Sequence, residues 1–63
     1  MGYRIKELRK EKKMSQEELA KKSGVSRTTI VNLEKGNDKT VLTSTLLNIA
    51  TALDTTVDKL FTT

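Results

Sequence analysis

Hydrophobic residues along this chain recur at intervals of three and four positions, and no segment alternates strictly between hydrophobic and polar residues. The first pattern is typical of one buried face of an α-helix, and strict alternation is typical of a β-strand. The pattern therefore predicts an all-α fold, a compact five-helix bundle. The expected helices cover residues 3–13, 16–23, 27–35, 44–53 and 57–61, and the expected loop covers residues 37–43.

Residues that favour helix ends lie between these segments. Ser15 with Glu18 three positions later is a capping box, in which each side chain hydrogen-bonds the backbone N–H of the other residue. Ser26 is the candidate N-cap of the helix at 27–35, and Thr43 or Ser44 is the candidate cap of the helix at 44–53. Gly24 and Gly36 suit the left-handed conformation in which many helices end.

The predicted core is aliphatic, because the chain has only two aromatic residues. A chain of 63 residues is long enough for a single small domain, which we expect to span residues 1–63. We expect Val31 to be partly inward and Leu42 to be an apolar anchor of the loop. The other expected core positions are Ile5, Leu8, Leu19, Ala20, Val25, Ile30, Leu33, Leu46, Leu47, Ile49, Ala50, Leu53, Val57, Leu60 and Phe61.

The composition excludes several classes of chemistry. The chain has no cysteine and no histidine, which excludes disulfides, thiolate nucleophiles, histidine bases and ordinary zinc sites. It also has no glycine-rich phosphate loop and no pair of carboxylates placed on a plausible cleft. We therefore expect no enzyme activity, no metal, no cofactor and no small-molecule ligand. The absence of a hydrophobic run of about 20 residues predicts a cytoplasmic protein that does not enter membranes.

The positive charge is concentrated in the first third of the chain. The formal net charge is +4, and residues 1–22 alone hold eight cations and four anions. A small basic domain favours a polyanionic partner, either nucleic acid or an acidic membrane surface. A solvated, solubilising helix face explains the same charges equally well. A membrane role is the least favoured, because the core requires the hydrophobic face of the first helix.

Residues 16–35 have the properties of two helices joined by a tight turn. Ala20 is small enough for two helices to cross closely, and Gly24 accepts a positive φ in the turn. The hydrophobic residues that would anchor the second helix are Leu19, Val25, Ile30 and Leu33. The outer side of that helix is left with residues that a partner can reach and the core does not need, namely Arg27, Thr28, Val31 and Asn32.

Six blocks of sequence carry a resemblance to a known family. In chain order they are Ile5-x-x-Leu8-Arg9, Met14-Ser15-Gln16-x-x-Leu19-Ala20, Gly24-Val25-Ser26, Ile30-x-x-Leu33-Glu34-x-Gly36, Leu46-Leu47-x-Ile49-Ala50-x-Ala52-Leu53 and Leu60-Phe61. With these blocks the chain resembles, over nearly its whole length, the DNA-binding domain of the lambdoid phage repressor and Cro group, the Xre-like helix-turn-helix family. The resemblance implies a nucleoid-associated transcriptional regulator that binds double-stranded DNA. It implies most specifically a repressor that occupies a near-palindromic operator as a homodimer.

The resemblance also implies roles for individual residues. It assigns base contacts to Arg27, Thr28 and Asn32, whose side chains suit guanine, thymine or another base edge, and adenine, respectively. It assigns an internal ion pair to Arg9 and Glu34, which would link the first helix to the end of the third. The residues that it places against backbone phosphates are Gln16, Ser26, Lys35, Asn37 and Lys39.

Two features depart from the family pattern. The loop at 37–43 is about one residue longer than usual and lacks the Pro-Ser that often opens the next helix, which leaves the half-site spacing undetermined. Asp54 stands where glycine or asparagine is usual. The candidate residues for a twofold contact are Val41, Val57, Leu60 and Phe61, although Leu60 and Phe61 also suit the core. The alternative function is a protein-interaction module of the same fold, antitoxin-like or coactivator-like, which would bind DNA only weakly and without sequence preference.

Overall fold

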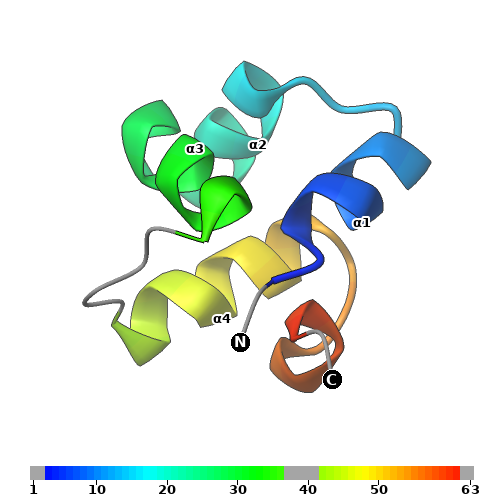
Figure 1. Ribbon diagram of the computed structural model, residues 1–63, viewed down its shortest axis with the longest axis vertical. Coiled ribbons are helices and arrows are strands. Elements are labelled where there is room, and N and C mark those ends of the chain that lie inside the picture. The colour runs from blue at the N-terminus through cyan, green and yellow to red at the C-terminus, as the bar shows by residue number, and fades with distance from the viewer. Residues whose placement is uncertain (1–2, 37–41, 62–63) are drawn as a thin grey trace.

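Helix ends that are encoded locally appear where the sequence places them. The computed structural model describes residues 3–36 and 42–61. Ser15 and Glu18 form the complete capping box, and Ser26 Oγ accepts a hydrogen bond from the Thr29 N–H at 3.2 Å. Gly24 and Gly36 end their helices in the left-handed conformation, with φ of 71° and 81°. The helices are α1 (Ile5–Glu11), α2 (Gln16–Ser23), α3 (Arg27–Lys35) and α4 (Thr43–Ala52), followed by the 3₁₀ turn η1 (Val57–Leu60) (Figure 1).

The fold is all-helical as predicted, but the predicted count of five helices is not confirmed. Over the part of the chain that the structure describes, four α-helices are followed by the single 3₁₀ turn η1, in place of a fifth α-helix. The first helix is also shorter than the predicted residues 3–13. Tyr3 forms an isolated antiparallel bridge with Phe61, and the Arg4 N–H donates to the Leu60 carbonyl at 2.6 Å. These two backbone contacts hold the start of the described chain extended beside its end.

The start of α4 differs from the prediction by one residue. The helix begins at Thr43, and its N-cap position is Leu42, which has no side chain able to accept a capping hydrogen bond. Neither Thr43 nor Ser44 therefore acts as the cap that the sequence suggested. A side-chain cap was predicted for α2, α3 and α4. Among these three helices, α4 is the one whose first turn has no such cap.

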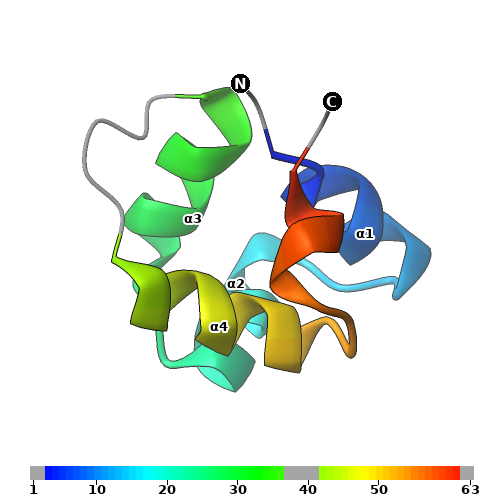
Figure 2. The same ribbon diagram turned by 90° about the horizontal axis from the view of Figure 1, so that it is seen from below.

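The core lies where α1, α2, α3, α4 and η1 converge. α2 packs against both α3 and α4, α1 packs against α3, and η1 packs against α4 (Figures 1 and 2). Each element contributes at least one side chain that is nearly or fully removed from solvent: Ile5, Leu19, Ile30, Leu33, Ile49, Leu53 and Leu60. The Tyr3 and Phe61 rings, with centroids 5.2 Å apart, close one side of this core.

Two hydrophobic residues that we expected in the core are exposed. Leu47 is 51% exposed and Leu42 is 66% exposed. The buried face of α4 is formed by Leu46, Ile49 and Ala50. Leu47 lies at the edge of this face, about 100° around the helix from Leu46, where the neighbours of α4 leave it exposed. These two leucines place exposed hydrophobic area on and just before α4.

Asp54 occupies the turn after α4 in a conformation that suits glycine better. Its φ is 57°, and its ion pair among the described residues, from Lys12 Nζ to Asp54 Oδ2 at 3.9 Å, is between exposed side chains. Left-handed backbone costs most L-residues about 1–2 kcal/mol, and less for aspartate. The turn that departs from the family pattern is therefore a strained one.

We expect Asp54→Gly to raise the free energy of unfolding by about 0.5 kcal/mol, because relief of the left-handed strain exceeds the extra entropy of glycine in the unfolded chain. Urea denaturation followed by circular dichroism measures this change. Asp54→Ala is the matched control, since it removes the same carboxylate and keeps a Cβ; it should give no gain. Equal stabilisation by both variants would show that the carboxylate, and not the backbone, is the unfavourable element.

Candidate nucleic-acid interface

α3 has one buried face and one exposed face. Ile30 and Leu33 are 0% and 1% exposed, whereas Arg27, Thr28 and Asn32 are all exposed. Within the described part of the chain, the side chains of these three residues form no hydrogen bond or ion pair. The predicted base-contacting residues therefore share one helix, and their polar groups are available to a partner.

The turn before α3 is stabilised by Ser23, a residue for which the sequence predicted no role. Ser23 is buried, and its hydroxyl donates to the Leu19 carbonyl at 2.7 Å. The same oxygen accepts from the Val25 N–H at 3.3 Å. Because Ser23 links the last turn of α2 to the residue that leads into α3, it helps to fix the angle between the two helices. The sequence feature that could have predicted this role is a small hydroxyl residue directly before Gly24.

Arg9 and Glu34 join α1 to the end of α3. Arg9 Nε lies 2.9 Å from Glu34 Oε2, and the two side chains are 10% and 5% exposed. Arg9 Nη2 approaches Glu34 Oε1 at 3.5 Å, and Arg9 Nη1 donates to the Met14 carbonyl at 2.7 Å. The guanidinium therefore also holds the segment between α1 and α2. The pair implied by the family resemblance is present and is more buried than a surface salt bridge.

Gln16 is the third member of this network. Its Nε2 donates to Glu34 Oε1 at 3.0 Å, so the first residue of α2 is tied to the last turn of α3. A side-chain amide has two N–H donors, and this bond uses one of them. The second donor is left for the phosphate contact that the family resemblance implies for Gln16. No local sequence pattern predicts the contact between Gln16 and Glu34, because it joins residues 18 positions apart.

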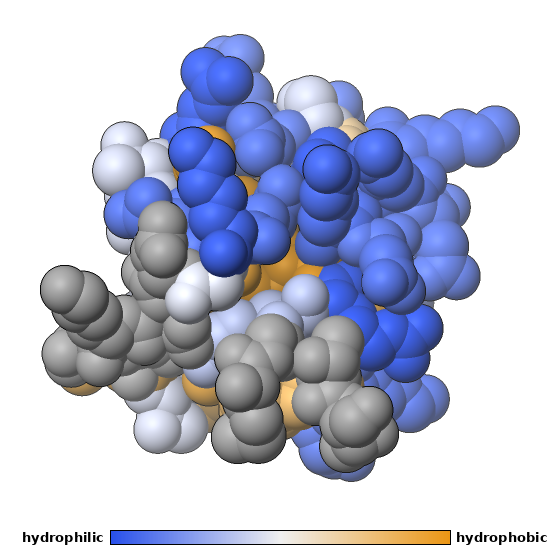
Figure 3. Space-filling view, in the orientation of Figure 1, coloured by the Kyte–Doolittle hydropathy of each residue, from blue (hydrophilic) through white to orange (hydrophobic). Residues whose placement is uncertain are grey.

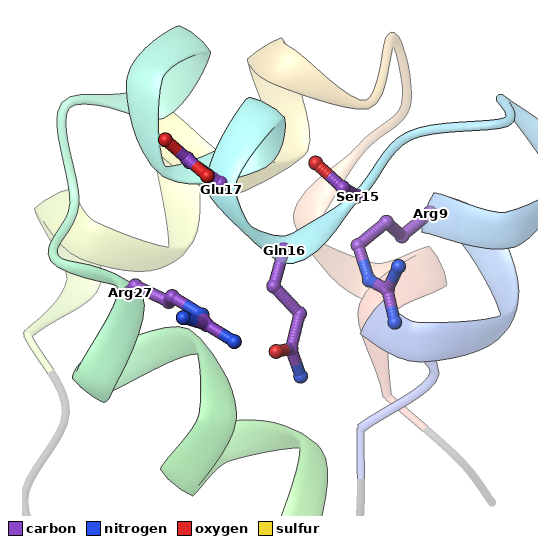
Figure 4. Close-up of a pocket in the computed structure, with 5 residues that line it drawn as sticks. All are labelled: Arg9, Ser15, Gln16, Glu17 and Arg27. Carbon is purple, nitrogen blue, oxygen red and sulfur yellow. The ribbon is translucent and has the colours of Figure 1, made fainter.

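An open hollow of about 310 Å³ lies at the start of α2. Figure 4 shows Gln16 between the guanidinium groups of Arg9 and Arg27, while the Glu17 carboxylate points away from both. The other lining residue is Ser15. The exposed Arg27 guanidinium and the first turn of α2 favour an anion at this position, whereas the charge of Arg9 is balanced by Glu34.

The remaining predicted phosphate contacts are less constrained. Ser26 is exposed, and its Oγ caps α3 and lies 2.9 Å from Thr29 Oγ1. Lys35 is exposed at the last position of α3. Asn37 and Lys39 lie outside the described residues. The face seen in Figure 3 is largely hydrophilic over α1, α2 and α3, and hydrophobic surface shows in the hollows between them and along the lower part of the view.

The described residues give little support for a metal site or a membrane-spanning helix. Among the described residues, no three acidic side chains come together in a group that could hold a metal ion. No helix within residues 3–36 and 42–61 is both long enough and hydrophobic enough to cross a membrane. A second open hollow, of about 410 Å³, lies between α4 and η1, and its lining is polar: Thr51, Asp54, Thr55, Thr56 and Lys59.

Comparison with known proteins gives one family and several relatives. The sequence pattern of the helix-turn-helix family matches residues 5–60. Two proteins of Archaeoglobus fulgidus, each described as an uncharacterized HTH-type transcriptional regulator, are 64% identical to this chain over 36 residues. That match covers 57% of this chain and spans about half the length of each of these curated relatives.

A solved structure extends the similarity to most of the fold. The crystal structure of the restriction-modification controller protein C.AhdI from Aeromonas hydrophila superposes with a TM-score of 0.83 at 41% sequence identity. The superposition covers 92% of this chain and 86% of that protein. Both the arrangement of the helices and a substantial part of the sequence are therefore similar in the two proteins.

Proposed function

This chain belongs to the helix-turn-helix family, and we propose that it is a transcriptional regulator that binds double-stranded DNA through α3. The observation that carries the proposal is the division of α3 into two faces. Ile30 and Leu33 anchor the helix in the core, while Arg27, Thr28 and Asn32 stand exposed with unused hydrogen-bonding groups. A helix that served only the fold would not require three base-competent side chains on its free face.

The proposed docking places α3 in the major groove, which is about 12 Å wide and admits an α-helix. Arg27 can donate two hydrogen bonds to guanine O6 and N7, and Asn32 can pair with adenine N6 and N7. Thr28 offers either a hydroxyl to a base edge or a methyl to thymine. Arg27 and Thr28 are at the start of the helix and Asn32 is one turn further, which is the arrangement used by recognition helices.

The start of α2 is proposed to contact the sugar-phosphate backbone. Gln16 presents its free N–H beside the Arg9 and Arg27 guanidinium groups, in the hollow that favours an anion. Ser26 and Lys35 extend the proposed contact along α3, and Asn37 and Lys39 would continue it beyond the described residues. Phosphate contacts of this kind fix the orientation of the protein and carry no sequence information.

Lys35→Ala is expected to weaken binding to all duplexes alike, because a phosphate contact is indifferent to base sequence. The slope of log K against log salt concentration should become less steep by about 0.9 if one counterion-releasing contact is lost. Titration of a cognate and a scrambled duplex at several salt concentrations measures both effects. An unchanged slope, or a loss confined to the cognate duplex, would contradict the phosphate role.

We further propose that the protein acts as a homodimer that represses transcription by occupying a near-palindromic operator in the cytoplasm, on nucleoid DNA. A single helix-turn-helix makes few contacts, and two copies on a twofold-symmetric site correct this weakness. Of the dimer candidates expected from the sequence, Leu60 is buried, Val57 and Phe61 pack against the core, and Val41 lies outside the described residues. Exposed Leu42 and Leu47 are therefore the better candidates for the twofold contact.

The test is selection of bound duplexes from a random pool, combined with measurement of the protein's mass in solution. The proposal predicts an enriched inverted repeat and a mass of two chains at the concentrations used for binding. Weak binding without enrichment would favour the alternative, a protein-interaction module of the same fold. Enrichment of an unrepeated site by a single chain would reject the homodimer and retain the DNA-binding function.

A further inference from the structure

Val31 differs from every other partly buried hydrophobic residue of the described chain. Eight such residues pack against the core: Tyr3, Leu8, Met14, Ala20, Val25, Ala52, Val57 and Phe61. Val31 has the same intermediate exposure but is not part of this packing. Its hydrophobic side chain is therefore not explained by the stability of the core.

The position of Val31 on α3 places it within the proposed reading face. It lies four residues after Arg27 and three after Thr28, and residues at these spacings are neighbours on one side of a helix. Asn32 follows it directly, and exposed Lys35 is one turn beyond. The polar groups of the reading face therefore surround one branched aliphatic side chain.

The major groove offers a natural partner for such a side chain. Among the four bases, thymine alone presents a methyl group there, at C5. We propose that Val31 is a specificity-determining residue that recognises thymine in each half-site by contact with this 5-methyl group. The inference rests on the proposed function, because it requires α3 to lie in the major groove.

The contribution of this contact to the binding affinity can be calculated. Burial of one methyl-sized group contributes about 0.8 kcal/mol, and about 1.4 kcal/mol corresponds to a tenfold change in affinity. Removal of the one thymine methyl that Val31 contacts should therefore weaken binding about fourfold. A hydrogen bond to the base would be unaffected, because deoxyuridine differs from thymidine only in lacking the 5-methyl group.

The experiment replaces each thymine of the selected operator by deoxyuridine, one position at a time, and measures the affinity of wild type and Val31→Ala. Wild type should lose about fourfold at one symmetry-related position, and Val31→Ala should show little further loss there. Two further duplexes carry cytosine or 5-methylcytosine in place of that thymine. Wild type should bind the duplex with 5-methylcytosine more tightly. Val31→Ala should not distinguish these two bases.

Two control variants separate this contact from other effects. Val57→Ala removes the same two methyl groups from a partly buried valine in η1, which lies away from α3 in both ribbon views (Figures 1 and 2). It should retain the wild-type response to deoxyuridine. Thr28→Ser removes the other candidate methyl of the face and should also retain the response at the Val31 position. Thermal unfolding of Val31→Ala should match wild type closely, since the residue does not pack on the core.

The outcomes distinguish this inference from the proposed function. Sequence-specific binding with no thymine whose methyl matters, or with a methyl effect that persists in Val31→Ala, overturns the role of Val31 and leaves the proposed function intact. A methyl effect abolished by Thr28→Ser and not by Val31→Ala also overturns it. The absence of any sequence preference in wild type overturns the proposed function itself.

Discussion

Replacement of Glu34 by alanine is expected to lower the free energy of unfolding by about 3–5 kcal/mol, because it leaves the buried Arg9 guanidinium without a counter-charge. The pair is separated by 2.9 Å, and its side chains are 10% and 5% exposed. The substitution also removes the acceptor of the Gln16 amide. One change therefore disconnects α1 and the start of α2 from the end of α3.

The size of this loss is large for such a small protein. Stabilities of about 0.05–0.15 kcal/mol per residue are usual, so a chain of this length has only about 3–9 kcal/mol in total. Urea denaturation followed by circular dichroism should show the unfolding transition of Glu34→Ala at a much lower urea concentration, with at least about a third of the total stability lost. A loss below about 1 kcal/mol would contradict the view that the buried pair holds α1 against α3.

Two further variants test whether the unpaired buried charge causes this loss of stability. Glu7→Ala removes a carboxylate from the exposed Arg4–Glu7 pair, whose side chains are 44% and 69% exposed, and should change stability by less than about 0.5 kcal/mol. The double variant Arg9→Met with Glu34→Leu removes both charges and should recover much of the loss, since a buried pair often adds little net stability over hydrophobic residues. Recovery would show that the uncompensated charge causes the instability.

Arg27→Ala is expected to weaken binding to the cognate operator by about 1–3 kcal/mol and to relax discrimination at one base pair. The corresponding change in affinity is about 5- to 150-fold. Binding to unrelated duplexes should fall much less, because only the charge and not a base contact is lost there. Stability should hardly change, since Arg27 is exposed and forms no ion pair among the described residues.

The measurement is titration of wild type and Arg27→Ala against the operator and its single-base variants. Lys59→Ala is the matched control, because it also removes one exposed cation but from η1, away from α3 (Figures 1 and 2). It should weaken all duplexes slightly and equally. An unchanged order of preference among the duplexes in Arg27→Ala would reject the base contact.

The elements that the sequence predicts correctly are those whose ends are decided locally. α2 and α3 begin and end at the predicted residues, because the capping hydroxyls of Ser15 and Ser26 and the glycines at 24 and 36 act within a few positions of themselves. The same logic explains why both faces of α3 were predictable. Periodicity fixes which residues of a helix share a side.

The errors occur where distant segments decide the outcome. Tyr3 is extended because it pairs with Phe61 at the other end of the chain, and Leu47 is exposed because the neighbours of α4 cover a narrower face than its sequence offers. The hydrogen bond from Gln16 to Glu34 joins two helices and follows from no local pattern. The Arg9–Glu34 pair was expected only from the family resemblance, since no local rule relates residues 25 positions apart.

Methylation interference on the selected operator tests whether the exposed face of α3 enters the major groove. Guanine N7 lies in the major groove and adenine N3 in the minor groove, and dimethyl sulfate methylates both. Methylation of guanine N7 at one position in each half-site should block binding of wild type, and this block should be lost in Arg27→Ala. Interference confined to adenine N3, or a guanine N7 block that persists in Arg27→Ala, would contradict this prediction.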